Sequence, residues 1–214
     1  MNFVITAGPT REPIDPVRYL SNRSSGKMGY AIAEAALERG HNVLLISGPV
    51  NLNPPPGAKV ISILSSDEMH DAVHDHLHDC DVLVMCAAVA DYKPAKVSAQ
   101  KIKRRHAPLS LELIPTRDIL ASVAKPDRQF LLVGFAAETN NLEEYAQKKL
   151  REKNCDLIVA NNVLTGIDSD ENEVTIFSRT GEQQTISRAP KQNIARELVK
   201  LFSNSCEKRL TKKM

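Results

Sequence analysis

The sequence lacks any apolar run that approaches the roughly 20 residues of a membrane-spanning helix. Its amino terminus passes directly into a strand-like segment, Asn2–Thr6, without the charged region and cleavage site of a secretory signal. Both observations argue against membrane insertion and against secretion. We therefore expect a cytoplasmic protein with no membrane partner.

Cysteine is also scarce. The four cysteines, Cys80, Cys86, Cys155 and Cys206, show neither C-x-x-C spacing nor the density of a disulfide scaffold. Cys86 and Cys155 lie within apolar strand-like runs, where burial raises the pKa of a thiol. We interpret both as core residues rather than as catalytic nucleophiles.

The sequence has little excess charge, because 28 Lys and Arg residues against 26 Asp and Glu residues give a formal net charge of +2. This balance gives no reason to expect a nucleic-acid partner. Hydrophobic residues make up 42% and charged residues 25%, which fits a globular protein. The 214 residues can bury a sizeable core. We expect a single domain over residues 1–204 and a basic, frayed tail over 205–214.

Apolar runs alternate with amphipathic segments along most of the chain. Short β-rich runs predict strands, and apolar residues at i, i+3, i+4 spacing predict helices. This order is typical of an α/β fold, Rossmann-like and doubly wound, with a mostly parallel sheet and an appended β element. The predicted strands are 2–6, 42–47, 59–64, 81–86, 109–114, 130–135, 156–160, 173–178 and 183–187, and the predicted helices are 28–37, 67–79, 116–120, 142–153 and 190–202.

The connection between the first strand and the first helix, Thr6–Gly29, is far longer than the about two to six residues usual for such loops. Ser24, Ser25 and Gly26 fall at the helix start, where unpaired backbone N–H groups and the helix dipole attract an anion. Ser-Ser-Gly is also ordinary capping chemistry, so these residues alone leave a structural role open. Together with the loop's length and its arginines, they predict a phosphate-binding loop.

Two familiar phosphate motifs do not fit this loop. Lys27 is followed by Met28, and Ser21 stands where a P-loop needs its first glycine. No acidic residue follows the second predicted strand at 47–49, where a dinucleotide-binding fold has its ribose-binding acid. The sequence therefore argues against a Walker A site and against an NAD-dependent oxidoreductase.

Several stretches together resemble the opening and the later motifs of phosphopantothenoylcysteine synthetase, the ligase of coenzyme A biosynthesis. They occur in the family's order, and the resemblance extends over most of the chain. The stretches are Thr6–Gly29, AAVADYKP at 87–94, KIKR at 101–104, GFAAETNN at 134–141 and the Lys149, Lys153 pair.

The resemblance implies that 4'-phosphopantothenate is joined to L-cysteine in two steps. CTP first converts the substrate carboxylate into an acyl-cytidylate with release of pyrophosphate, and the cysteine amine then displaces CMP. Mg²⁺ is expected with the nucleotide, bound mainly through phosphate oxygens, and no flavin is expected. The family is dimeric, so we expect a homodimer that forms through the appended β element.

The resemblance also assigns roles to residues. Asn22 and Lys101 are the expected catalytic residues: the Asn22 amide orients the acyl intermediate without acting as a nucleophile. Lys101 belongs to a basic loop, 96–106, that resembles a flap closing over the triphosphate. Nucleotide contacts are implied for Ala87, Asp91, Lys101, Asp118, Ile119, Phe135, Lys149 and Lys153, and 4'-phosphopantothenate contacts for Arg18, Asn22, Ser24, Ser25 and Gly26.

Two residues depart from the family's pattern. Arg104 replaces a lysine of the flap, and Arg117 replaces a proline that often precedes the aspartate of the nucleotide site. Either change keeps or adds charge and alters hydrogen-bond geometry. The side-chain contacts of Arg117 are therefore not implied by the resemblance.

Three histidines, His70, His74 and His78, recur at a spacing that suits a metal site on a helix. An apolar stripe on the same segment turns them toward a solvated face, so we assign no metal ligand. The sequence does not separate CTP from ATP, a stand-alone enzyme from one domain of a bifunctional protein, or an enzyme from a noncatalytic binding subunit. It also names no general base for the cysteine amine.

Overall fold

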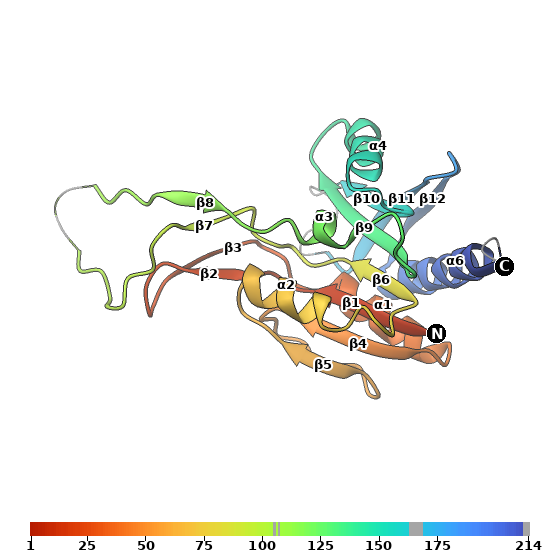
Figure 1. Cartoon of the computed structure of the whole chain (residues 1–214), viewed down its shortest axis with the longest axis horizontal. Coiled ribbons are helices and arrows are strands. Elements are labelled where there is room, and N and C mark those ends of the chain that lie inside the picture. Colours follow the sequence, from red (N-terminus) through yellow and green to blue (C-terminus); the bar gives the residue numbers. More distant parts are fainter. Residues whose placement is uncertain (105, 107, 163–168, 212–214) are drawn as a thin grey trace.

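The computed structural model describes residues 1–104, 106, 108–162 and 169–211. Its centre is an eight-stranded sheet in the order β12-β11-β10-β9-β6-β1-β4-β5 (Figure 1). The parallel strands are β1 (Asn2–Ala7), β4 (Asn42–Ser47), β5 (Lys59–Ser62), β6 (Val82–Met85), β9 (Leu131–Glu138) and β10 (Leu157–Asn162). The antiparallel hairpin β11 (Glu171–Ser178) and β12 (Gln183–Pro190) extends the sheet beyond β10.

The parallel strands follow the order of a doubly wound fold. From β1 the chain builds outward through β4 to β5, then returns to the other side of β1 and continues through β6 and β9 to β10. The strand order reverses between β1 and β6, and ligands of such folds bind beyond the carboxyl ends of the strands at this point. The predicted α/β, Rossmann-like fold is confirmed.

Helices cover both faces of the sheet. The helices α1 (Lys27–Glu38) and α6 (Lys191–Thr211) pack on one face, and α2 (Ser66–His74), α3 (Ile119–Val123) and α4 (Leu142–Glu152) pack on the other (Figure 1). Alternate residues of a strand point to opposite faces, so Ile5 packs with the first group and Val4 with the second. Burial on both faces explains why the parallel strands are almost continuously apolar. Among the described residues, no helix is long and apolar enough to cross a membrane.

Two small antiparallel ribbons project beyond the sheet (Figure 1). One pairs β2 (Arg11–Pro13) with β3 (Tyr19–Ser21), and the other pairs β7 (Tyr92–Pro94) with β8 (Leu113–Pro115). We call the segments 11–21 and 92–115 the arm. The predicted strand at 109–114 is thus shifted to β8, which pairs with β7 in the arm and leaves the central sheet.

Several predicted helix boundaries were wrong. The helix predicted for 67–79 ends at His74, because the segment that follows offers little apolar surface to bury. The short helix α3 begins after Asp118, whose carboxylate caps it by accepting from the Ala121 N–H at 2.9 Å. Thr116 does not cap it, since its hydroxyl donates to the Ala90 carbonyl at 2.7 Å.

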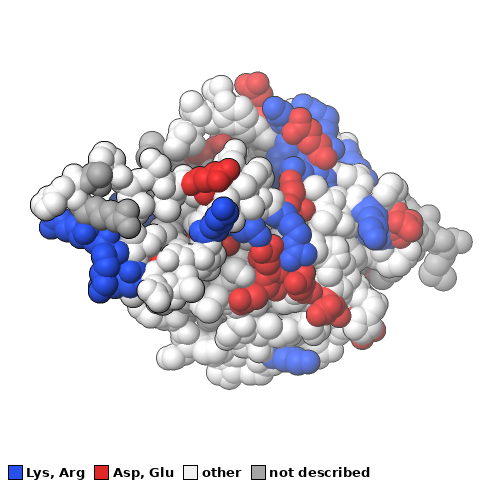
Figure 2. Space-filling view, turned by 60° about the vertical axis from the view of Figure 1, so that its left-hand side comes forward, with Lys and Arg blue, Asp and Glu red and all other residues white. Residues whose placement is uncertain are grey.

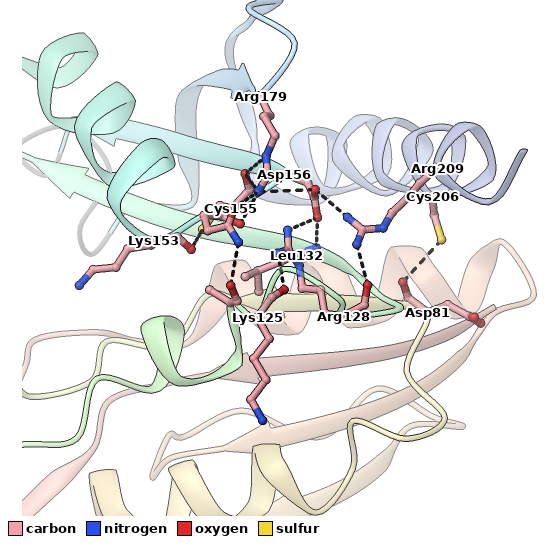
Figure 3. Close-up of polar contacts among 12 residues, drawn as sticks. Asp81, Lys125, Arg128, Leu132, Lys153, Cys155, Asp156, Arg179, Cys206 and Arg209 are labelled. Atoms are coloured by element: carbon pink, nitrogen blue, oxygen red, sulfur yellow. Dashed lines mark hydrogen bonds and ion pairs between the residues drawn. The ribbon is translucent and has the colours of Figure 1, made fainter. Parts of the chain in front are cut away.

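The carboxyl-terminal helix is also longer than predicted. It continues to Thr211, so residues 205–211, which we expected to fray, are helical, whereas 212–214 lie outside the described residues. Figure 3 shows the reason: Arg209 donates to the Asp156 carboxylate at 2.7 Å and to the Arg128 carbonyl at 2.8 Å. The same carboxylate accepts from Arg128 at 2.7 Å and from the Leu132 N–H at 2.9 Å. This buried cluster ties the helix to the edge of the sheet where β9 and β10 begin.

Candidate active site

A cavity of about 460 Å³ lies beyond the carboxyl ends of the parallel strands, at the point where the strand order reverses. The loop before α1, the segment that follows β6 and the carboxyl-terminal halves of β9 and β10 line it, as do α4, β11 and the first residues of α1 and of α6. The lining residues used below are Asn22, Ser24, Ser25, Gly26, Lys27, Cys86, Ala87, Asp91, Phe135, Lys149, Asn161, Asn172 and Lys191.

The start of α1 forms one wall of the cavity. Gly26 precedes the helix with φ 77°, a left-handed conformation that favours glycine, and no side chain caps the helix there. A Cβ at Gly29 would lie 2.6 Å from the Ala7 Cβ, so glycine lets the helix start approach β1 closely. The first N–H groups of a helix have no partner within the helix. Ser24, Ser25 and Gly26 therefore stand at a helix start that can attract an anion, and all three line the cavity.

Asn22 is held where the loops after β1 and β6 run side by side. The Asn22 amide donates to the Ala88 carbonyl at 3.0 Å. Ala88 in turn donates its N–H to the Gly8 carbonyl at 2.9 Å and accepts from the Thr10 N–H at 3.2 Å. These backbone bonds extend the β1–β6 pairing past the strand ends and fix the Asn22 side chain at the cavity.

Lys149 brings a half-buried cation to the opposite wall. It lies on α4, and its ammonium donates to the Phe135 carbonyl at 2.7 Å. Burial lowers the pKa of Lys149, because water no longer solvates the charged form. An anionic ligand in the cavity would offset that cost by pairing with the ammonium.

The other predicted nucleotide residues divide into two groups. Ala87, Asp91 and Phe135 line the cavity with Lys149. Asp118, Ile119 and Lys153 lie outside its lining: Lys153 pairs with the Asp118 carboxylate, and the Ile119 side chain is buried in the core.

Arg18 and Lys101 also lie outside the cavity of their own chain, because both belong to the arm. Arg18 pairs with Asp15, and Lys101 is exposed on the loop between β7 and β8. Figure 2 shows basic side chains gathered at this projecting end of the molecule. Arg117 faces α2, where it pairs with Asp67 and Asp71.

Sequence reasoning missed two buried polar residues of the cavity. Lys191 and Asn172 are each 6% exposed, and both line it. Lys191 donates from its ammonium to the Ser169 carbonyl at 2.6 Å. A lysine in the first turn of a helix opposes the helix dipole, and this local conflict was the one available signal.

The cysteines and histidines agree with a noncatalytic role. Burial raises the pKa of Cys86 and of Cys155 to about 12, so neither thiol ionises near neutral pH. The His70 and His74 rings lie in contact, tilted by 34° with their centroids 4.3 Å apart, and His74 shares a hydrogen bond with the Ser122 hydroxyl. In the part of the chain that the structure describes, no group of three or more His, Cys, Asp or Glu side chains could hold a metal ion.

The fold and the cavity together define a doubly wound α/β protein with a cavity at the strand-order reversal, bordered by a helix start and by Lys149. Residues 1–205 match the family model described as the DNA/pantothenate metabolism flavoprotein C-terminal domain. The chain therefore belongs to this family.

Relatives at 46–48% identity are called coenzyme A biosynthesis bifunctional protein CoaBC. The protein of Escherichia coli (strain K12) is 48% identical over 190 residues, which cover 86% of this chain and 47% of the relative. That of Bacillus subtilis (strain 168) is 46% identical over 202 residues, which cover 92% and 50%. The chain thus spans about half the length of the curated relatives it matches.

Solved structures give the same result. The crystal structure of the C-terminal domain of coenzyme A biosynthesis bifunctional protein CoaBC matches with a TM-score of 0.84 and 44% identity, covering 97% of this chain and 96% of that one. A Cab2 mutant in complex with phosphopantothenate-cysteine matches with a TM-score of 0.85 at 17% identity, covering 99% and 88%. The second match shows the shared fold.

Proposed function

We propose that this chain is a phosphopantothenate–cysteine ligase. The observation that carries the proposal is the match along almost the whole chain to the C-terminal domain of a coenzyme A biosynthesis protein, at 44% identity. The cavity supports it, since a helix start that attracts anions, an amide and a half-buried lysine lie at one place. The complex of the Cab2 relative with phosphopantothenate-cysteine points to the same product class.

The proposed reaction has two steps. A carboxylate oxygen of 4'-phosphopantothenate attacks the α-phosphorus of CTP, which forms the acyl-cytidylate and releases pyrophosphate. The cysteine nitrogen then attacks the acyl carbon, forms the amide, loses a proton and displaces CMP. A carboxylate oxygen is a poor leaving group, and the first step replaces it with a good one, CMP. The amine can then displace CMP from the acyl carbon.

Backbone N–H groups and lysines would hold the phosphates during these steps. The helix start at Ser24–Gly26 would bind the phosphate of 4'-phosphopantothenate, and Lys149 would neutralise the nucleotide from the opposite wall. Asn22 would donate to the acyl intermediate between them. Lys153 and Asp118 would complete the nucleotide site once the basic loop of a second copy's arm, which carries Lys101, closes over it.

Mg²⁺ would enter with the nucleotide. Asp91 is the one carboxylate among the lining residues of the described chain, so the protein offers few ligands of its own. This fits a cation held mainly by phosphate oxygens, where it would offset their negative charge. We propose no flavin for this chain, and a cytoplasmic location.

The test of the function is ligation by the purified chain. With Mg²⁺, CTP, 4'-phosphopantothenate and cysteine, we expect a product of the mass of 4'-phosphopantothenoylcysteine and one CMP per product. An equal or faster reaction with ATP would support the ligase function but contradict the assignment of CTP as the nucleotide. Binding of the substrates without product would favour a noncatalytic binding subunit.

We also propose that the arm forms a homodimer. Eight of its apolar side chains are at least 38% exposed, which is unusual for a monomeric surface. Association through this surface would also bring Arg18 and Lys101 toward the cavity of a second copy. The residues are Val17, Tyr19, Tyr92, Val97, Leu109, Leu111, Leu113 and Ile114.

A charge in this surface should separate the two copies. Leu113 is 44% exposed on β8, and Leu113→Glu would bury an unpaired carboxylate in the interface. In sedimentation equilibrium we expect a dimer for the native protein and a monomer for the variant. Tyr145→Glu alters a residue outside the arm that is 38% exposed, and this variant should stay dimeric. A monomeric native protein would disprove the proposal.

A further inference from the structure

Asp15 is a buried carboxylate in the turn between β2 and β3, only 3% exposed. Its two oxygens have different partners. Oδ1 accepts from the Val17 N–H and from the Arg18 N–H, each at 2.9 Å, and so closes the turn. Oδ2 accepts from the Arg18 guanidinium, with Nε at 3.0 Å, and from the Ile102 N–H at 3.1 Å.

The contact with Ile102 joins two distant segments of the arm. Ile102 also accepts from Arg18 Nη2 at 2.9 Å, so the Asp15–Arg18 pair holds both polar groups of its backbone unit. A second bond, from the Ser98 N–H to the Ile14 carbonyl at 3.0 Å, ties the same two segments together. The Arg18 guanidinium holds the pKa of Asp15 well below its usual range, so the carboxylate stays charged.

We call the contacts of Asp15 and Arg18 with the Ile102 backbone the clasp. The neighbours of Ile102 determine what the clasp does. Ile102 lies between Lys101 and Lys103, whose side chains are exposed. Fixing its backbone therefore fixes the direction in which Lys101 leaves the loop. The same carboxylate orients Arg18, so one buried group sets the positions of two cations that the family resemblance assigns to different substrates.

We propose that Asp15 is a positioning residue that holds Lys101 for the nucleotide and couples it to Arg18. This inference rests on the proposed ligase function. Closure of the β2–β3 turn needs only Oδ1, whereas positioning of Lys101 needs Oδ2.

The variant Asp15→Asn separates these two roles. The asparagine Oδ1 can still accept from Val17 and Arg18, but its NH₂ group would face the donors of Arg18 and Ile102. We expect a KM for CTP raised by about tenfold, because a charged hydrogen-bond partner is lost, with thermal stability changed little. Glu38→Gln is the matched control: it removes a carboxylate that binds Arg196 through two hydrogen bonds on the opposite side of the domain, and should leave this KM unchanged.

A double-mutant cycle with Lys101→Gln tests the route of the effect. If Asp15 acts through Lys101, then Asp15→Asn adds no further rise of the KM for CTP in the Lys101→Gln background. Multiplicative effects, or an unchanged KM in Asp15→Asn alone, would overturn the proposal. A rise confined to the KM for 4'-phosphopantothenate would show that Asp15 positions Arg18 alone, and would also overturn the proposal.

A readout without catalysis distinguishes failure of this proposal from failure of the ligase function. Trypsin cleaves after Lys101, Lys103 and Arg104, and a released loop should be cut about tenfold faster in Asp15→Asn than in the native protein or in Glu38→Gln. An inactive native protein would contradict the ligase, and the cleavage rates would still test the clasp. Equal rates in the native protein and Asp15→Asn would overturn it.

Discussion

Replacing Asn22 with aspartate is expected to lower ligase turnover by about 100-fold to 1,000-fold, the usual effect of losing a preorganised donor to a developing negative charge. The native amide donates to the Ala88 carbonyl at 3.0 Å and borders the cavity. A carboxylate of the same shape cannot donate. It would repel both the Ala88 carbonyl and the phosphoryl oxygens of the acyl-cytidylate.

The defect should fall on the second half of the reaction. We expect Asn22→Asp to release pyrophosphate without matching formation of the amide, as followed by phosphate detection and by product mass. Asn42→Asp is the matched control. Asn42 donates to Asn2 at the amino ends of β4 and β1, away from the cavity, so this variant should keep native turnover. Native turnover in Asn22→Asp would show that the role proposed for the amide is wrong.

Removal of the Asp156 carboxylate is expected to destabilise the fold by about 3–5 kcal/mol. Its partner Arg128 is only 2% exposed, and Arg209 is 19% exposed, so Asp156→Ala would leave buried cations without their carboxylate (Figure 3). The variant would also lose an acceptor for the Leu132 N–H at the start of β9. Helix α6 would then be less firmly joined to the sheet.

Urea unfolding of both proteins would measure this change. Glu171→Ala is a suitable comparison, because its pair with Arg188 is exposed and such pairs contribute about 0–1 kcal/mol. Asp156 lies where β10 begins, at the edge opposite the cavity, so the folded variant should keep its KM values. A loss below about 1 kcal/mol in Asp156→Ala would contradict the account of the cluster.

The central sheet was predictable because its strands are buried on both faces. Continuous apolar runs such as 42–47 leave no alternative to a covered parallel strand, and β4 has these bounds. The arm was not predictable from local pattern. The predicted strand 109–114 alternates apolar and polar residues as a sheet strand does. Only its end belongs to β8, whose apolar side chains are exposed and whose partner β7 has three residues.

The candidate site was predictable where it depends on local chain geometry. The helix start at Ser24–Gly26 follows from a long loop between a strand and a helix, and it borders the cavity. The role of Lys191 depends instead on α6 packing beside α1, which brings the last helix to the first loop. No spacing rule relates such distant segments, so its burial at the cavity could not be read from sequence.

In the proposed reaction, the cavity activates 4'-phosphopantothenate before cysteine takes part. The most direct measurement is pyrophosphate release by the purified native chain with Mg²⁺, CTP and 4'-phosphopantothenate, before and after cysteine is added. The account predicts a burst of about one pyrophosphate per active site without cysteine, then sustained release with it. Absence of release until cysteine is present would contradict activation as a separate first step.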